Sequence, residues 1–308
     1  MIKRAQNRIA QSRWSLPVTA IYGLLLFLIS GMASQGLWLQ LLILVASTVM
    51  MVILNNNNSL IRIYSRMVSC SFYVVVLMSP FLFSSINIGI AQLAFIFSLN
   101  FILRAFQDKQ AVGWVFYAFV AIGVASVFYV ELLWLVPILW ILLTTNVLAM
   151  SLRTFIASIL GVALPYWFLS AYYLLIGNPQ AIADHFEAMM LWQQPFDFSM
   201  LDSHRGLTFL FVAILGIIGS VHFVAYSYQD KIRTRMIFEM FITLEICLLV
   251  LLILLPQHFD VLLSLLLTVV SPLIGHFLSL THSKLSNITF FTLIIAALAL
   301  TIFNIWMP

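Results

Sequence analysis

Few residues in this chain could take part in acid–base chemistry, because only 8% of its 308 residues are charged. Two glutamates stand out because apolar residues surround them: Glu131 in VASVFYVELLWLVPILW and Glu245 in MIFEMFITLEICLLVLLILL. A carboxyl group beside hydrocarbon is poorly solvated, which raises its pKa and suits it to proton transfer. Glu131, between two apolar runs, is therefore the candidate catalytic acid, with an interfacial carboxylate that reaches water as the alternative.

Glu245 differs from Glu131 because it lies deep inside one apolar run. It is roughly 9 residues, or about 13 Å at 1.5 Å per residue, from the start of that run, which is close to the midplane of a bilayer. Burying a carboxyl group there costs about 3 kcal/mol, so Glu245 is expected to face other helices, to be protonated or to be paired. This intramembrane acid is either a proton carrier or a buried hydrogen-bonding group.

Two pairs of acidic and imidazole side chains form a second group of candidates. They are Asp202-x-His204 and His258-x-Asp260. Such groups bind divalent metals, but neighbours of this kind also arise by chance in polar turns, and we assign no metal to them. Together with one nearby cation, the candidate substrate-binding residues are Arg205, Asp202, His258 and Asp260.

Other motifs exclude several function classes. The sequence contains no Gly-rich phosphate loop, no HExxH or GxSxG motif, and no nucleic-acid pattern of interleaved basic and aromatic residues. Nucleic acid is therefore excluded as a partner, and the cofactor remains unknown. Arg62 and Arg66, four residues apart on one predicted helical face in SLIRIYSR, could hold a phosphate or only contact anionic lipid.

The elements that must position these residues are apolar helices. With 63% hydrophobic residues the chain cannot be a soluble globular protein, and its apolar runs of about 20 residues have the length of bilayer spans. The sequence predicts a single integral membrane domain, residues 1–308, folded as an all-α transmembrane bundle of about eleven helices. The predicted segments are 16–32, 37–54, 68–83, 86–102, 111–128, 132–148, 155–175, 207–226, 237–255, 261–280 and 288–305.

The basic residues predict how the bundle is oriented. If the basic N-terminus, residues 1–15, is cytoplasmic, all but one of the 14 basic residues fall in cytoplasmic loops or segment ends, and the exception is Arg205. A missed or invented helix would break this alternation. The sequence therefore predicts an N-in, C-out protein of the bacterial inner membrane.

One sizeable outer loop, residues 177–206, interrupts the short connections. Its segment PQAIADHFEAMMLW places Ile182, Phe186, Met189 and Met190 on one helical face, which predicts an amphipathic helix on the outer membrane surface. Two roles stay open for this loop, a lid without chemistry and a cover over a substrate. Its acidic residues are Asp184, Glu187, Asp197 and Asp202.

From residue 55 to residue 148, the order of features resembles the membrane core of the GT-C superfamily of polyprenyl-phosphate-sugar-dependent glycosyltransferases. The resemblance is carried by SLIRIYSR, VVVLMSPFLF, FILRAF and WVFYAFVAIGVASVFYVELLWLVPILWILL. Gly123, Ala125 and Ser126 match a small-residue stretch of that family, whereas residues 128–131 replace its basic turn. The resemblance implies a GT-C-like fold that handles a polyprenyl-phosphate-linked substrate in cell-envelope glycan assembly.

The chain departs from the GT-C pattern at one important point. Those enzymes place a catalytic acid in a long first outer loop, whereas the first outer loop here is Ala33-Ser34-Gln35-Gly36. A second resemblance, in RTFIASILGVALPYWFLSAYYLLIGN and SPLIGHFLSL, is to an uncharacterised family of polytopic inner-membrane proteins of the Bacteroidota. That family implies no activity.

Three function classes therefore remain open, and the sequence does not decide whether the chain is an enzyme. The first handles a polyprenyl-phosphate-linked substrate, and the second is a non-catalytic membrane subunit or scaffold that docks a membrane-protein partner. The third, a proton-coupled transporter that uses Glu245, is disfavoured because no internal repeat is evident. The expected partners are membrane lipids, including a polyprenyl-phosphate lipid, and a membrane protein.

Overall fold

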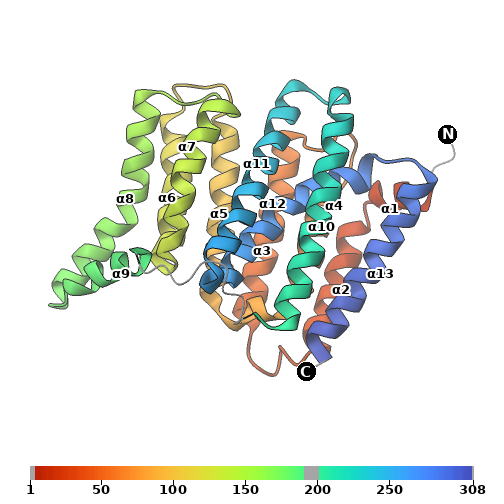
Figure 1. Ribbon diagram of the computed structural model, residues 1–308, viewed down its shortest axis with the longest axis horizontal. Coiled ribbons are helices and arrows are strands. Elements are labelled where there is room, and N and C mark those ends of the chain that lie inside the picture. Colours follow the sequence, from red (N-terminus) through yellow and green to blue (C-terminus); the bar gives the residue numbers. More distant parts are fainter. Residues whose placement is uncertain (1–3, 191–200, 307–308) are drawn as a thin grey trace.

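The computed structural model describes residues 4–190 and 201–306. The regular elements of these two stretches are α-helices and short 3-10 helices, without a strand, so the all-α prediction is confirmed (Figure 1). In chain order the elements are α1 Ala5–Ala10, α2 Ser15–Ile29, α3 Trp38–Asn58, α4 Met67–Leu77, η1 Pro80–Ser84, α5 Ile86–Arg104, α6 Val112–Phe128, η2 Val130–Trp134, α7 Leu135–Thr145, α8 Leu152–Leu175, α9 Gln180–Met190, α10 Ser203–Tyr226, η3 Ser227–Gln229, α11 Ile232–Leu254, η4 Pro256–His258, α12 Phe259–Leu280 and α13 Lys284–Trp306.

Seven of the described helices are long and apolar enough to cross a membrane. They are α3, α5, α8, α10, α11, α12 and α13. Shorter apolar helices, α2, α4, α6 and α7, occupy the other predicted segments. This architecture is that of a multi-pass membrane protein, while the total of eleven spans, the single domain and the N-in orientation stay predictions.

We name the two ends of the bundle after the predicted orientation. The outer end carries Glu131, Arg205 and Asp260, and the inner end carries Arg62 and Asp230. In Figure 1 the inner end is at the top, where α10 passes into α11, and the C-terminus of α13 is at the opposite end.

Helix α12 is the most enclosed of the seven long apolar helices. Within its membrane-crossing stretch 89% of the residues are buried, against 22% for α8. It contacts α4, α5, α10 and α11, and two glycines allow the closest approaches. Gly275 packs against the backbone of Val68 in α4, and Gly219 of α10 packs against the backbone of Leu273, so a side chain at either glycine would collide.

Helices α6, α8 and α9 form one edge of the molecule, at the left of Figure 1. Gly161 of α8 and Gly123 of α6 each lie against the backbone of the partner helix, which explains the tight α6–α8 pair. The predicted helix in the long outer loop is confirmed as α9, and its Phe186 ring lies 5.0 Å from that of Tyr166. Its position on a membrane surface stays a prediction, and Asp197 lies outside the described residues.

Candidate functional site

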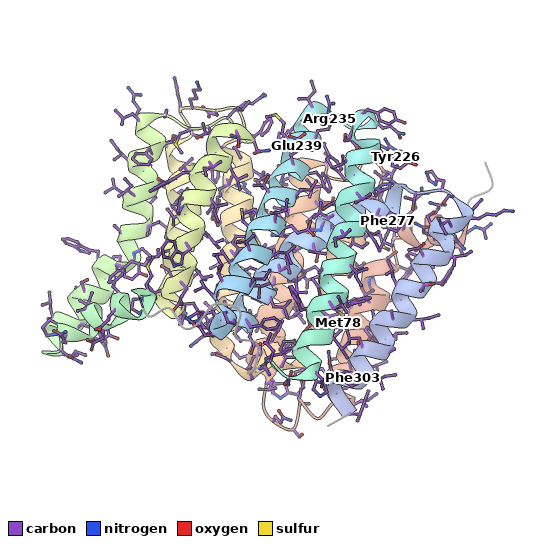
Figure 2. All side chains as sticks on the ribbon, viewed as in Figure 1. Met78, Tyr226, Arg235, Glu239, Phe277 and Phe303 are labelled. Carbon is purple, nitrogen blue, oxygen red and sulfur yellow. The ribbon has the colours of Figure 1, made fainter. Side chains whose placement is uncertain are left out.

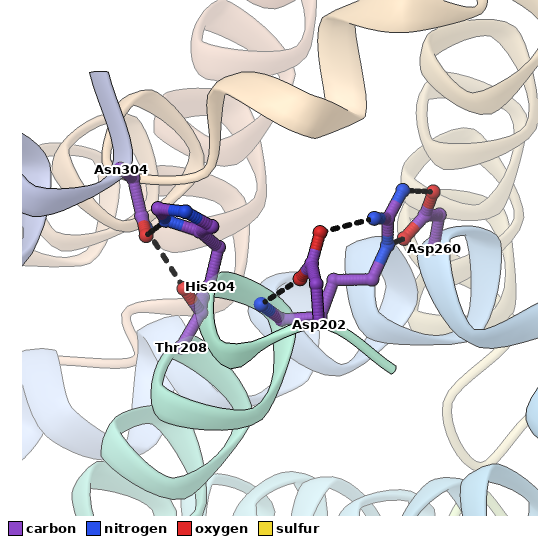
Figure 3. A network of polar contacts seen from close by, with 6 residues as sticks. Asp202, His204, Thr208, Asp260 and Asn304 are labelled. Atoms are coloured by element: carbon purple, nitrogen blue, oxygen red, sulfur yellow. Dashed lines mark hydrogen bonds and ion pairs between the residues drawn. The ribbon is translucent and has the colours of Figure 1, made fainter. Parts of the chain in front are cut away.

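At the outer end, Arg205 is held by two carboxylates, as Figure 3 shows. Its Nε and Nη2 donate to the two oxygens of Asp260 at 2.8 Å each, and its Nη1 donates to Asp202 Oδ2 at 2.9 Å. The ring of Phe81 lies 5.1 Å from the guanidinium carbon and adds a cation–π contact. A paired, bidentate arrangement of this kind fixes the guanidinium in place.

Helix ends explain why these residues meet. Asp202 is the N-cap of α10, where its Oδ1 accepts the backbone N–H of Arg205 at 2.8 Å. Asp260 is in the first turn of α12, where a negative charge favours the helix dipole. Since both helices begin at the outer end, the two carboxylates can flank the same guanidinium.

A second ion pair joins Glu131 to His258. The Nε2 atom of His258 lies 3.0 Å from Glu131 Oε1, and Glu131 is 7% exposed in the turn η2 between α6 and α7. Burial raises the pKa of the Glu131 carboxyl, but its hydrogen bonds and the nearby imidazoles outweigh burial and leave the pKa below its ordinary value. The expectation of a raised pKa is therefore wrong, because the sequence could not show that an imidazole lies beside Glu131.

The remaining imidazole of the predicted cluster turns away from it. His204 Nδ1 lies 3.2 Å from Asn304 Oδ1, and Asn304 Nδ2 donates to Thr208 Oγ1 at 2.9 Å (Figure 3). The same amide nitrogen donates to the carbonyl of Met78 at 2.7 Å. His204 thus helps to join α10 to α13, and no group of three metal-ligating side chains occurs in 4–190 and 201–306.

The structure therefore brings the predicted catalytic residue and the four predicted substrate-binding residues to the outer end, as a Glu131–His258 pair and a cluster of Arg205 with two carboxylates. His258 and Asp260, two residues apart at the start of α12, connect the Glu131 pair to the Arg205 pair. Each of these charges has a partner of opposite sign, with His258 able to supply one when protonated. These ion pairs can hold α10, α12 and η2 together, and the same groups could also take part in a reaction if the pairs opened.

The intramembrane acid Glu245 is 3% exposed and accepts a hydrogen bond from a hydroxyl. Ser220 Oγ of α10 donates to its Oε2 at 2.6 Å. Gly216, one turn earlier on α10, leaves the space that the carboxyl occupies, because a Cβ there would collide with it. Glu245 thus links α10 to α11 through a small-residue notch.

A second polar cluster, at the inner end, was missed by sequence reasoning. Asp230, whose side chain is 2% exposed, accepts a hydrogen bond from His276 Nε2 at 3.1 Å. Arg62 Nη1 lies 3.8 Å from the other oxygen of Asp230, and its Nη2 donates to Gln229 Oε1 at 2.7 Å. The two arginines of SLIRIYSR diverge, because residues 59–66 are not helical and Arg66 reaches Asn56 instead. The prediction that they share a helical face is wrong.

A cavity of about 280 Å³ adjoins this inner cluster. Figure 2 labels Tyr226, one of its lining residues, at the inner end of α10, near Arg235 and opposite the end that carries Phe303. His222 and His276 also line it, and their Nδ1 atoms are buried without a hydrogen-bond partner in the part of the chain that the structure describes. Buried polar atoms of this kind usually bind something.

An apolar groove of about 430 Å³ lies beside α12 on the inner half of the bundle. Its lining comes from α2, α4, α10, α12 and α13, with Thr19, Val74, Leu215, Ile274 and Ile294 as representatives. Its floor is buried and its rim is exposed, since Ile274 is 2% and Ile294 41% exposed. The groove therefore opens at the surface of the bundle, with its buried floor against α12.

No protein family, curated protein or solved structure matches this chain. The resemblances to the GT-C superfamily and to the family of the Bacteroidota accordingly stay predictions. The two polar clusters and the groove are therefore the features that bear on function.

Proposed function

We propose that this protein is a multi-pass protein of the bacterial inner membrane that binds a polyprenyl-phosphate-linked substrate of cell-envelope glycan assembly. The observation that carries the proposal is the apolar groove beside α12, whose buried floor and exposed rim suit a hydrocarbon chain entering from the lipid phase. The GT-C resemblance supplies the substrate class, because that family uses polyprenyl-phosphate sugars.

Basic residues at the inner mouth of the groove favour a lipid with an anionic head group. Ile9, Ser12 and Trp14 line the mouth. Their chain neighbours Arg8 and Arg13 are exposed. Each arginine near a membrane surface adds about 1 kcal/mol of attraction to an anionic lipid. A phosphate-bearing lipid therefore fits this mouth better than a neutral one.

A non-catalytic membrane subunit or scaffold is the second candidate, and the pairing in the outer cluster favours it. The carboxylate of Glu131 is bound to His258, and the guanidinium of Arg205 is bound to Asp202 and Asp260. A reaction at this end needs one of these pairs to open. In this alternative the protein docks a membrane-protein partner, and the chemistry is carried out by that partner.

Native mass spectrometry of protein extracted gently from its own membranes tests the proposal. We expect a co-purifying polyprenyl-phosphate species that Ile294→Trp displaces, because the indole ring fills the groove. The matched control is Ile295→Trp, since Ile295 is the next residue of α13, is 66% exposed and does not line the groove.

The two outcomes lead in different directions. Equal lipid retention by both variants, or retention of bulk phospholipid alone, would overturn the proposed use of the groove. A stoichiometric protein partner without such a lipid would establish the scaffold alternative instead.

A further inference from the structure

The cavity at the inner end combines buried imidazoles with a cationic rim. His276 is 1% exposed, and its Nε2–H donates to Asp230 at 3.1 Å. In the neutral ring Nδ1 is therefore an acceptor, and it has no hydrogen-bond partner among the described residues. His222 Nδ1 is in the same condition, and the two rings lie 5.5 Å apart. An unsatisfied buried polar atom costs about 1–3 kcal/mol, so two of them beside one cavity indicate a ligand position.

The fixed charges around the cavity favour an anion. Arg62 and Asp230 on the wall offset each other. Lys231 and Lys284 directly follow the lining residues Asp230 and Ser283, and both lysines are exposed. With every imidazole neutral, the charged residues in the lining and next to it in the chain, Arg62, Asp230, Lys231 and Lys284, therefore carry a net positive charge.

The donors at the wall suit a phosphate group. A guanidinium has five N–H groups, and among the described residues the hydrogen bonds of Arg62 go to Gln229, with Asp230 further away at 3.8 Å, so donors remain for a ligand. Tyr226 and His282 also line the cavity, and the P–OH group of a monohydrogen phosphate is the donor that Nδ1 of a neutral His276 needs. A volume of about 280 Å³ far exceeds the ~30 Å³ share of one water molecule, so a phosphate with part of its substituent fits.

A metal ion suits the same cavity poorly. Within the described stretches no three His, Cys, Asp or Glu side chains are placed to hold one. The carboxylate of Asp230, the strongest ligand nearby, is already bound to His276.

We propose that the inner cavity formed by Arg62, His222 and the Asp230–His276 pair binds a phosphate group, either of a free phosphate compound or of a lipid head group. This site stands on residues separate from the groove, and only its lipid form rests on the proposed function.

Titration of the purified full-length protein with inorganic phosphate, followed by calorimetry against sodium chloride of equal ionic strength, tests the inference. We expect saturable binding that Arg62→Gln weakens about tenfold, since one charge-assisted contact is lost. Arg66→Gln is the matched control, because Arg66 belongs to the same segment but contacts Asn56 and does not line the cavity. His222→Phe keeps a ring beside Phe277 and is expected to weaken binding as well.

A second arm separates the two sources of phosphate. Protein is reconstituted into phosphatidylcholine vesicles with and without phosphatidic acid, and bound lipid is counted by native mass spectrometry. Retention of phosphatidic acid that depends on Arg62, without binding of inorganic phosphate, identifies a lipid head group. Failure of both probes, or equal loss in Arg62→Gln and Arg66→Gln, would overturn the inference. Ile294→Trp is expected to leave inorganic phosphate binding unchanged, so failure of the groove proposal is seen separately.

Discussion

The outer and inner ends of the bundle carry polar clusters of similar composition that differ in how fully their members are paired. At the outer end, one guanidinium is bound by two carboxylates and a third carboxylate is bound by an imidazole. At the inner end, a buried carboxylate and imidazole are paired, but two imidazole nitrogens beside a cavity have no hydrogen-bond partner within residues 4–190 and 201–306.

The difference teaches that charge alone does not mark a binding site. Sequence reasoning favoured the outer end because Arg205 is the one basic residue predicted there. Its hydrogen bonds are used within the protein, so that cation stabilises the fold before it can bind a ligand. The inner end offers unused donors and space.

The largest effect is expected when the Arg205 cluster at the outer end loses one carboxylate. Asp260→Ala leaves Arg205 with only Asp202, and we expect a loss of about 2 kcal/mol of unfolding free energy, since two charge-assisted hydrogen bonds to the guanidinium are removed together. Denaturant unfolding in mild detergent measures it. The double variant Asp260→Ala, Arg205→Ala should recover part of this loss. Asp184→Ala is the control, and an equal unfolding free energy for Asp260→Ala and Asp184→Ala would contradict a stabilising role of the Arg205 cluster.

A smaller effect is expected at the neighbouring pair. Glu131→Gln keeps a hydrogen bond to His258 but loses the charge, for a loss of about 1 kcal/mol at neutral pH. Because the pKa of Glu131 is below its ordinary value of 4.5, the carboxylate stabilises the fold above that pH and stops doing so as the pH falls through the lower folded value. Stability curves of the two proteins should therefore converge in acid. Curves that stay parallel would count against the pair.

Between the two ends, Glu245 tests whether a buried acid with a neutral partner behaves as a structural group. Glu245→Gln retains an oxygen that accepts the Ser220 hydroxyl, so the unfolding free energy should change by less than about 0.5 kcal/mol. The proposed retention of a polyprenyl-phosphate lipid in the native membrane should also persist in this variant. A variant that folds normally but has lost the biological activity of the protein would instead support the proton-coupled transporter, because glutamine cannot carry a proton.

The smallest effect on stability is expected at the inner rim. Arg62 is 38% exposed and 3.8 Å from Asp230, so Arg62→Gln should change the unfolding free energy by no more than about 0.3 kcal/mol. The same variant should reduce phosphate binding, which sets it apart from Asp260→Ala. A large loss of unfolding free energy in Arg62→Gln would mean that the inner arginine, like Arg205 at the outer end, mainly stabilises the fold.

The sequence predicted the helices well because hydrocarbon-length apolar runs leave the backbone no other way to satisfy its hydrogen bonds. Every predicted segment contains an α-helix, but segment 68–83 is divided into α4 and η1, and segment 132–148 into the end of η2 and α7. It also placed Glu131, Arg205 and Asp260 at one end, since helices that alternate in direction return their loops to the same side.

The pairing of side chains could not be predicted in the same way. Asp230 and His276 are 46 residues apart and share no motif, so only packing of α10, α11 and α12 brings them together. The sequence offers one weak indication of this cluster, which is that the acidic Asp230 directly precedes the basic run KIRTR. The left-handed backbone of Ser59, with φ at 49°, ended α3 and separated Arg62 from Arg66, which a periodicity argument could not foresee.

The enclosed position of α12 has a consequence for biogenesis. Helices α4, α5, α10 and α11 all contact α12, yet all precede it in the chain. If the helices enter the membrane in chain order, these four are inserted before α12. Until then, the surfaces that α12 covers in the complete bundle, including those at Gly219 and Val68, are exposed to lipid. The bundle closes only when α12 arrives. A chain halted before Phe259 would therefore expose the surfaces that membrane quality control recognises, even though most of its helices have already been inserted.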